Sequence, residues 1–288
     1  MTPINEAYRQ IGTQLAARLG HPAVDGLYLP APVADETFRD EFGFVLLADG
    51  SVGPFYVSMG DLLRMLWLRH PQPAQLRSDA TTLLEGFADG DIARRALALG
   101  TYNALSAALF HRVGFVPPER AGNAGLNGVA AGSSVGMVGY FRPLVDRLSA
   151  QGCSVRVLEL SPERVEDKEG VSRCSDPSEL IGCDLVLCTA SALINNSLEG
   201  LLALLAGRVR IEMIGPSGSG LPDPLFARGI SAVGGSLFRG QAKLIEHLGR
   251  GEPWGSVAHK YQLDAAAYPG LTRLLEKLSD SQAEASQA

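Results

Sequence analysis

The sequence predicts an α/β protein of two units, a small α+β domain followed by a domain built on a parallel sheet. Its 288 residues suit two domains at roughly 150 residues each. Strand patterns precede helical patterns in the first half, whereas strand and helix patterns alternate in the second half. Apolar residues make up 46% and charged residues 19% of the chain, so we expect both units to be folded.

The first domain opens with a helix and two strand segments. Residues 4–19 carry apolar side chains at helical spacing. Strand patterns follow at 24–32 and 41–59, and the second is interrupted at Asp49-Gly50, a dipeptide that tolerates the positive φ of a hairpin turn. We therefore expect a small meander behind the opening helix.

Three helical patterns complete the first domain, over residues 58–70, 81–88 and 91–113. The third is rich in Ala and Leu, begins at Asp91 and ends before Gly114. Residues 116–134 then contain two adjacent prolines and several glycines, which prevent a helix and offer little to pack. We place the domain boundary in this segment, with the first domain at 1–118.

Alternating patterns predict the second domain, residues 119–278. Strand patterns lie at 134–141, 154–162, 183–190, 209–218 and 231–238, and helical patterns at 142–152, 196–207, 223–230 and 241–250. This alternation predicts a parallel sheet with helices on both faces, and such sheets bind ligands at the carboxyl ends of their strands. The small, polar residues of 279–288 predict a disordered tail.

Charge and hydropathy exclude two classes of partner. Lys and Arg number 25 against 31 Asp and Glu, and no segment carries the dense basic stripe that binds nucleic acid. No run of 18 apolar residues occurs, which excludes a membrane-spanning helix. The chain begins MTPINEAYRQ, without the basic and apolar regions of a signal peptide, so we expect a cytoplasmic protein.

No signature of a metal centre or an activated nucleophile is present. The cysteines form no CxxC and the five histidines are scattered. G-x-S-x-G matches once, at Gly132, Ser134 and Gly136, but this match lies at the start of a strand pattern and not at the strand-to-helix turn of a nucleophile elbow. We therefore assign no metal ligand, although carboxylates could meet across the domains without a sequence signal. If the protein is an enzyme, the acid-base candidates are Tyr140 and Glu159, followed by Asp223 and Glu199.

The first strand-to-loop junction of the second domain contains Gly139, and Arg142-Pro143 then opens a helix. Glycine allows a ligand to approach the backbone closely, and a helix amino terminus favours negative charge. Glu159 ends the next strand twenty residues later, about where nucleotide-binding folds place an acid for the ribose hydroxyls. Because G-x-G-x-x-G is absent, a turn or a packing role for the glycine remains the alternative to nucleotide binding.

Two later junctions are rich in small polar residues. Residues 189–197 read T-A-S-A-L-I-N-N-S, which indicates either helix capping at Asn195, Asn196 or Ser197, or a pocket for a polar ligand. Residues 215–222 read G-P-S-G-S-G-L-P, whose backbone N–H groups could form an anion-binding concavity. The alternative for this second stretch is a flexible turn, and the Lys of a P-loop is absent.

In the first domain, Asn103 and Ser106 lie on one face of an otherwise apolar helix. Such side chains often bond to the neighbouring backbone. The functional alternative is that Asn103 faces a cleft between the domains.

Taken together, these motifs resemble the putative heavy-metal chelation family. The similarity rests on A-L-G-T-Y-N-A-L-S, V-G-Y-F-R-P-L, L-E-L-S-P, T-A-S-A-L-I-N-N-S-L-E and I-G-P-S, and it runs over nearly the whole chain. It implies an amino-terminal domain like the small first domain of enolase, a Rossmann-like second domain and a site in the cleft between them. The family's cleft motifs fall on Asn103, Gly139, Tyr140, Phe141, Glu159, Ser161, Thr189, Asn195, Asn196, Gly215, Pro216 and Ser217.

Two functions remain open at this point. The first is binding of a small polar or anionic ligand, or a metal complex, in the cleft, with Asn103 and Tyr140 on the substrate. The second is an enzyme that uses an adenosine-containing cofactor such as S-adenosylmethionine, with Gly139 and Glu159 on the cofactor. A divalent metal is a further cofactor to test, and we expect a homodimer.

Overall fold

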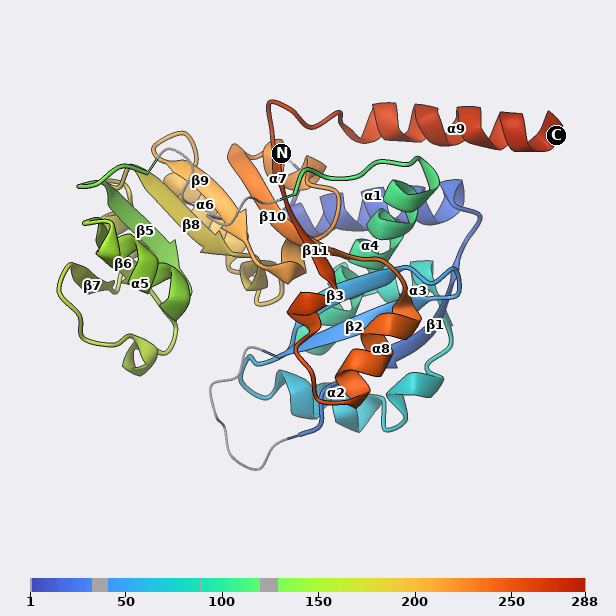
Figure 1. Ribbon diagram of the computed structural model, residues 1–288, viewed down its shortest axis with the longest axis horizontal. Helices are drawn as coiled ribbons and strands as arrows, with labels where there is room; N and C mark the ends of the chain where they lie inside the picture. Colours follow the sequence, from blue (N-terminus) through green and yellow to red (C-terminus); the bar gives the residue numbers. More distant parts are fainter. Residues whose placement is uncertain (1, 33–40, 89, 120–128, 288) are drawn as a thin grey trace.

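The computed structural model describes residues 2–32, 41–88, 90–119 and 129–287, and it contains two sheets (Figure 1). One sheet has four antiparallel strands in the order β3-β2-β1-β4, and the other has seven strands in the order β11-β10-β9-β8-β5-β6-β7. A small α+β unit followed by a Rossmann-like unit is the predicted fold class, which is confirmed. Residues 120–128 of the expected boundary segment lie outside the described residues.

The first unit contains α1 (Ile4–Arg18), β1 (Ala23–Tyr28), β2 (Phe42–Leu47), β3 (Val52–Tyr56), α2 (Leu62–Arg69), β4 (Ser78–Asp79), α3 (Ala80–Leu84) and α4 (Ile92–Arg112). The predicted hairpin joins β2 and β3, and Gly50 in its turn has a φ of +86°. The Asp49 carboxylate accepts a hydrogen bond from the Ser51 N–H at 2.9 Å. The turn therefore forms because Gly50 can adopt a positive φ and the Asp49 side chain bonds to the backbone of the turn.

Helix α4 is buried along most of its length. The Asp91 carboxylate caps its first turn by accepting from the Ala93 N–H at 2.8 Å. Of its 21 residues, 17 are buried. The hairpin crosses it so closely that a Cβ at Gly53 would lie 1.9 Å from the Gly100 carbonyl oxygen. The backbones of β3 and α4 thus touch, which is possible only without a side chain at this point.

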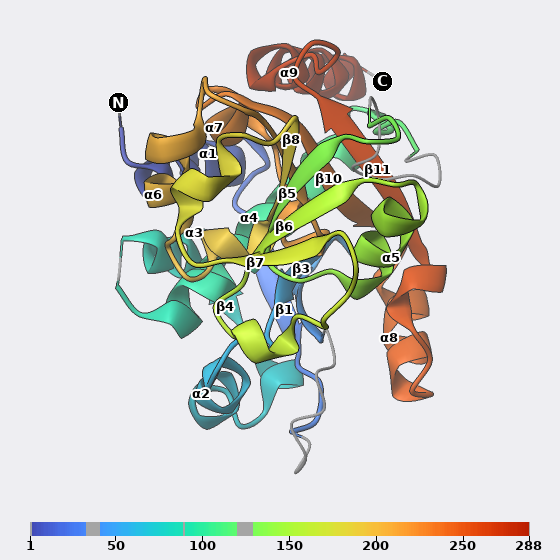
Figure 2. The ribbon, with the colours of Figure 1, turned by 90° about the vertical axis from the view of Figure 1, so that its left-hand side faces the viewer.

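The second unit contains β5 (Ser134–Val138), α5 (Arg142–Ala150), β6 (Ser154–Leu158), β7 (Val171–Cys174), β8 (Leu185–Thr189), α6 (Leu198–Leu205), β9 (Arg210–Ile214), α7 (Asp223–Phe226), β10 (Ile230–Phe238), α8 (Gln241–Gly249), β11 (Ala258–Asp264) and α9 (Leu271–Gln287). Strands β5 to β10 run parallel, and Figure 2 shows α5 and α6 on opposite faces of their sheet. The edge strand β11 is antiparallel to β10, so the sheet is mixed rather than wholly parallel.

The carboxy-terminal end differs from the prediction of a disordered tail. Helix α9 continues through residues 279–287. Its first turns are anchored by Leu274, Leu275 and Leu278, which are buried in the main core, and the Arg18 guanidinium donates to the Leu275 carbonyl. Because this anchor forms the costly first turns of the helix, the polar residues that follow can extend it.

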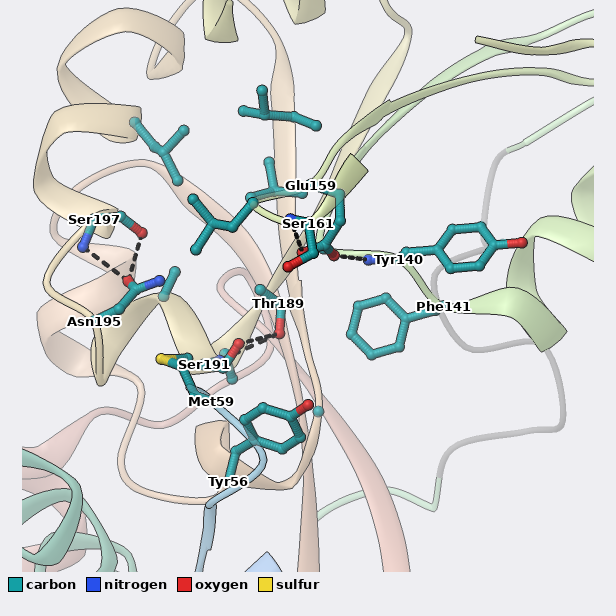
Figure 3. Close-up of a pocket in the computed structure, with 18 of the residues that line it drawn as sticks. Tyr56, Met59, Tyr140, Phe141, Glu159, Ser161, Thr189, Ser191, Asn195 and Ser197 are labelled. Carbon is teal, nitrogen blue, oxygen red and sulfur yellow. Dashed lines mark hydrogen bonds between the residues drawn. The ribbon is translucent and has the colours of Figure 1, made fainter. Parts of the chain in front are cut away.

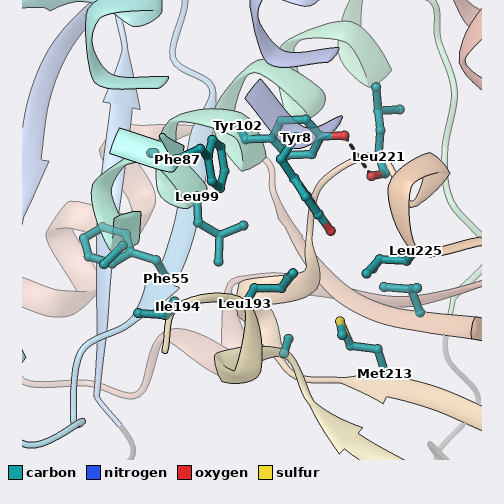
Figure 4. Packing of buried hydrophobic residues seen from close by; sticks show 14 of the residues in the cluster. Tyr8, Phe55, Phe87, Leu99, Tyr102, Leu193, Ile194, Met213, Leu221 and Leu225 are labelled. Atoms are coloured by element: carbon teal, nitrogen blue, oxygen red, sulfur yellow. Dashed lines mark hydrogen bonds between the residues drawn. The ribbon is translucent and has the colours of Figure 1, made fainter. Parts of the chain in front are cut away.

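The two units share their cores. Figure 4 shows Tyr8 and Tyr102 of the first unit packed beside Leu221 and Leu225 of the second. On the opposite face of the small sheet, Phe44 stacks edge-on against Phe238 with ring centroids 5.4 Å apart. Helix α8 covers that face (Figure 1). None of the helices in the described ranges has the length and apolar character needed to cross a bilayer.

Substitution of Gly53 by Ala tests the contact between β3 and α4. We expect the free energy of unfolding to fall by about 3 kcal/mol, because the new methyl group would force the helix off the hairpin. Gly249→Ala is the control, since a Cβ at Gly249 meets nothing within 4 Å. Equal urea midpoints for the two variants would contradict the close packing.

Candidate functional site

A cavity of about 1180 Å³ lies at the carboxyl ends of the parallel strands, where the small sheet faces the large one. The strand order reverses between β5 and β8, because β6 and β7 lie on one side of this pair and β9 and β10 on the other. Ligands of open α/β sheets bind at such a switch point. Size and topology therefore both mark this cavity as the candidate site.

Most of the site residues predicted from the sequence lie around this cavity (Figure 3). Those that line it are Gly139, Tyr140, Phe141, Glu159, Ser161, Thr189, Asn195, Gly215, Pro216 and Ser217. Asn103 and Asn196 are not among the lining residues. The strand-end junctions are thus brought together although they are far apart in sequence.

Gly139 forms the turn after β5, directly beside Thr189 at the end of β8. Its φ is +85°, and a Cβ there would lie 3.0 Å from Thr189 Cγ2. Its N–H donates to the Leu158 carbonyl at 2.9 Å, which ties the turn to β6. Glycine is required here for both conformation and space, which leaves the backbone accessible at the switch point.

Glu159 holds the turns after β5 and β6 together. One carboxylate oxygen accepts from the Tyr140 N–H at 2.8 Å and the other from the Ser161 N–H at 3.2 Å. Figure 3 shows these bonds at the centre of the cavity. Each carboxylate oxygen has two lone pairs, so the group retains the capacity to accept from a ligand hydroxyl.

The polar residues of the junction after β8 are hydrogen-bonded largely to one another. The Thr189 and Ser191 hydroxyls lie 2.8 Å apart, and Asn195 Oδ1 accepts from the Ser197 hydroxyl at 2.6 Å. Asn196 instead accepts from the Asn5 amide, away from the cavity, with a φ of +63°. Ser197 is the N-cap of α6 but makes no side-chain capping bond, whereas the Thr189 side chain caps the 3-10 turn Ala190–Leu193. Local bonding and a polar cavity wall are therefore compatible roles, because Thr189, Ser191, Asn195 and Ser197 also line the cavity.

The junction after β9 is not the open anion-binding loop that its glycines suggested. The Gly218 and Ser219 N–H groups donate to the carbonyls of Gly215 and Pro216, and the Leu221 N–H donates to the Ser106 hydroxyl. These donors are occupied because residues 217–221 are buried. The loop is wedged against α4, where a Cβ at Gly220 would lie 2.5 Å from the Tyr102 ring.

Asn103 joins the units from inside the core. Its amide nitrogen donates to the Pro54 carbonyl at 2.8 Å and to the Ser217 carbonyl at 3.0 Å. Ser217 in turn accepts from the Tyr56 N–H at 2.9 Å through its hydroxyl. Asn103 is only 1% exposed, so it positions the cavity wall rather than facing the cleft.

The acid-base candidates differ in whether their side chains reach the cavity. The Tyr140 ring points away from Glu159 in Figure 3, and only its backbone N–H bonds to that carboxylate. Asp223 accepts from the Tyr268 hydroxyl and Glu199 from the Ile4 N–H, and neither lines the cavity. Glu159 is thus the predicted carboxylate that reaches the site.

Several lining residues were missed by sequence reasoning. Tyr56 and Met59 reach the cavity from the end of β3, and the Tyr56 phenol points toward Phe141 and Thr189 (Figure 3). Leu160 and Leu204 form another wall. The only sequence signal for the β3 contribution was the end of a strand, which does not reveal that this end faces another sheet.

The residues of the cavity do not fit a bare metal ion. Within the described parts of the chain, no group of three or more His, Cys, Asp or Glu side chains could hold a metal. Cys174 lines the cavity, but burial raises the pKa of its thiol. A raised thiol pKa disfavours the thiolate, the form that binds metals.

Comparisons with known proteins agree on the family. A family model described as DUF364, putative heavy-metal chelation, matches residues 124–266. This match covers just under half of the chain, and it confirms the resemblance seen in the motifs. A comparison with curated proteins finds no match.

Two solved structures share the two-unit fold. A protein of unknown function from the DUF364 family of Desulfitobacterium hafniense DCB-2 is 18% identical, with a TM-score of 0.61, over 90% of this chain and 98% of the other. A DUF364 protein of unknown function from Pyrococcus horikoshii is 15% identical, with a TM-score of 0.65, over 91% and 99% of the two chains. At these identities the similarity concerns the fold alone.

Replacement of Asn103 by Ala tests its role between the units. We expect a loss of about 2–4 kcal/mol in the free energy of unfolding, because two buried carbonyls lose their donor. Asn5→Ala removes an exposed amide bond to Asn196 and should change stability by less than about 1 kcal/mol. Similar urea midpoints for both variants would show that Asn103 does not hold the units together.

Proposed function

We propose that this DUF364 protein binds a small polar organic ligand, free or as its metal complex, in the cleft between its two sheets. The cavity at the strand-order reversal carries the proposal, because it combines the expected location with residues from both units. Its volume of about 1180 Å³ suits an organic molecule and is far larger than a single ion requires.

The polar side of the cavity supports an oxygen-rich ligand. Hydroxyl groups of Thr189, Ser191 and Ser197 and the carboxylate of Glu159 line it. Such groups orient a ligand by hydrogen bonds, whereas a bare heavy-metal ion needs a set of protein ligands. A metal would accordingly enter as a complex whose organic part supplies the coordination.

A second candidate is an enzyme with an adenosine-containing cofactor such as S-adenosylmethionine. The order β7-β6-β5-β8-β9-β10 is that of the dinucleotide-binding sheet, and Glu159 directly follows the strand that carries the ribose-binding acid in that fold. The Gly139 turn lies beside it, where a cofactor passes close to the backbone.

The proposal places the protein in the cytoplasm. All four cysteines are free thiols, which suits a reducing compartment. A homodimer remains our expectation, because closed symmetric pairs are the commonest oligomers of soluble proteins.

Thermal unfolding of metal-stripped protein distinguishes an organic ligand from a bare ion. We expect citrate, Ni²⁺-citrate or S-adenosylmethionine to raise the Tm by roughly 5 °C at 100 times its Kd, because a ligand at that concentration adds about 2.7 kcal/mol. Ni²⁺ alone should not produce this shift. An equal shift with Ni²⁺ alone would contradict the proposal.

Glu159→Gln locates the binding in the cleft. The variant should lose most of the shift given by the most effective organic probe, because the cavity loses its central carboxylate. Glu163→Gln removes an exposed carboxylate from the same loop and should retain the shift. Retention in both variants would place the binding elsewhere.

A further inference from the structure

We infer that one end of the cavity is a compartment for the planar ring of a nucleoside, an assignment that rests on the proposal of an organic ligand in this cleft. Leu158, Leu160, Leu201 and Leu204 all line the cavity, and we refer to them as the leucine compartment. Nothing in the polar chemistry of the strand-end junctions requires these leucines.

Exposure of the leucines indicates that a partner is missing. Four large hydrophobic side chains in the described part of the chain are exposed, and two of them, Leu160 at 80% and Leu204 at 40%, line this cavity. Leu201, on the same helix as Leu204, is only 7% exposed. The leucines of the cavity therefore range from buried to largely exposed, which suits a pocket that an apolar group completes.

The leucine compartment lies between the end of β6 and helix α6. Leu158 and Leu160 flank Glu159 at the end of β6. Helix α6 supplies the other leucines and packs against the 3-10 turn Pro177–Leu180 after β7. A ring held by the leucines would leave an attached sugar beside the Glu159 carboxylate, which can accept from its hydroxyls.

The turn after β5 favours a single nucleoside over a dinucleotide. Phe141 stands at the N-cap of α5 without a side-chain capping bond, and its ring points into the cavity in Figure 3. Pro143 occupies the first turn of α5 and has no N–H to offer a pyrophosphate. Pro143 thus removes one of the N–H groups that a pyrophosphate would use, whereas the ring and sugar positions need no such donor.

Isothermal titration with adenosine tests the leucine compartment. We expect adenosine to bind the wild-type protein, Leu160→Ser and Leu204→Ser each to weaken it severalfold, and the double variant to weaken it at least tenfold. The matched control is Leu68→Ser, because Leu68 is 70% exposed on α2 and does not line the cavity. Its affinity for adenosine should equal that of the wild type.

Each other outcome overturns the assignment in a distinguishable way. Adenosine binding that is unchanged in the double variant, or equally weakened in Leu68→Ser, places the ring outside the leucine compartment. If wild-type protein does not bind adenosine but shows a Glu159-dependent shift with citrate or Ni²⁺-citrate, the compartment is wrong and the proposed function stands. Absence of binding by every probe overturns both.

Discussion

Burial of helix α4 is the constraint on which the rest of the molecule depends. A helix covered on nearly every side can keep polar side chains only if other elements supply their partners. Loops of the large sheet do so, since Arg95 donates to the Ile194 carbonyl and Tyr102 to the Leu221 carbonyl. Asn103 adds the Ser217 carbonyl. The strand ends that surround the cavity are therefore positioned by a helix of the other unit.

In this arrangement the polar residues near the cleft have two different roles. Those below the surface, such as Ser217 and Ser219, bond to the chain itself and fix the cavity wall. Those at the surface, such as Glu159 and Thr189, bond locally and still face the cavity. A small polar residue at a strand end therefore indicates a ligand only when its surroundings leave it accessible.

The local elements could be predicted because local chemistry specifies them. Asp49-Gly50 specified a hairpin, Asp91 a helix start, and Gly139 with Glu159 two neighbouring strand ends. Tertiary contacts decided what could not be predicted. The end of β3 faces the cavity, residues 217–221 are buried, and the leucines of α9 pack into a distant part of the core. None of these follows from spacing along the chain, because each depends on an element far away in sequence.

The packing of α8 against the small sheet affects how the chain can be divided into fragments. Phe44 and Val52 share a core with Phe238 and Leu244, which are separated from them by almost the whole second unit. A fragment that ends at residue 118 would leave this face of its sheet uncovered. During synthesis this face of the small sheet stays uncovered until about residue 250 has left the ribosome. The first unit to be made is therefore completed late. The molecule is continuous as a folding unit even though its sheets are separate.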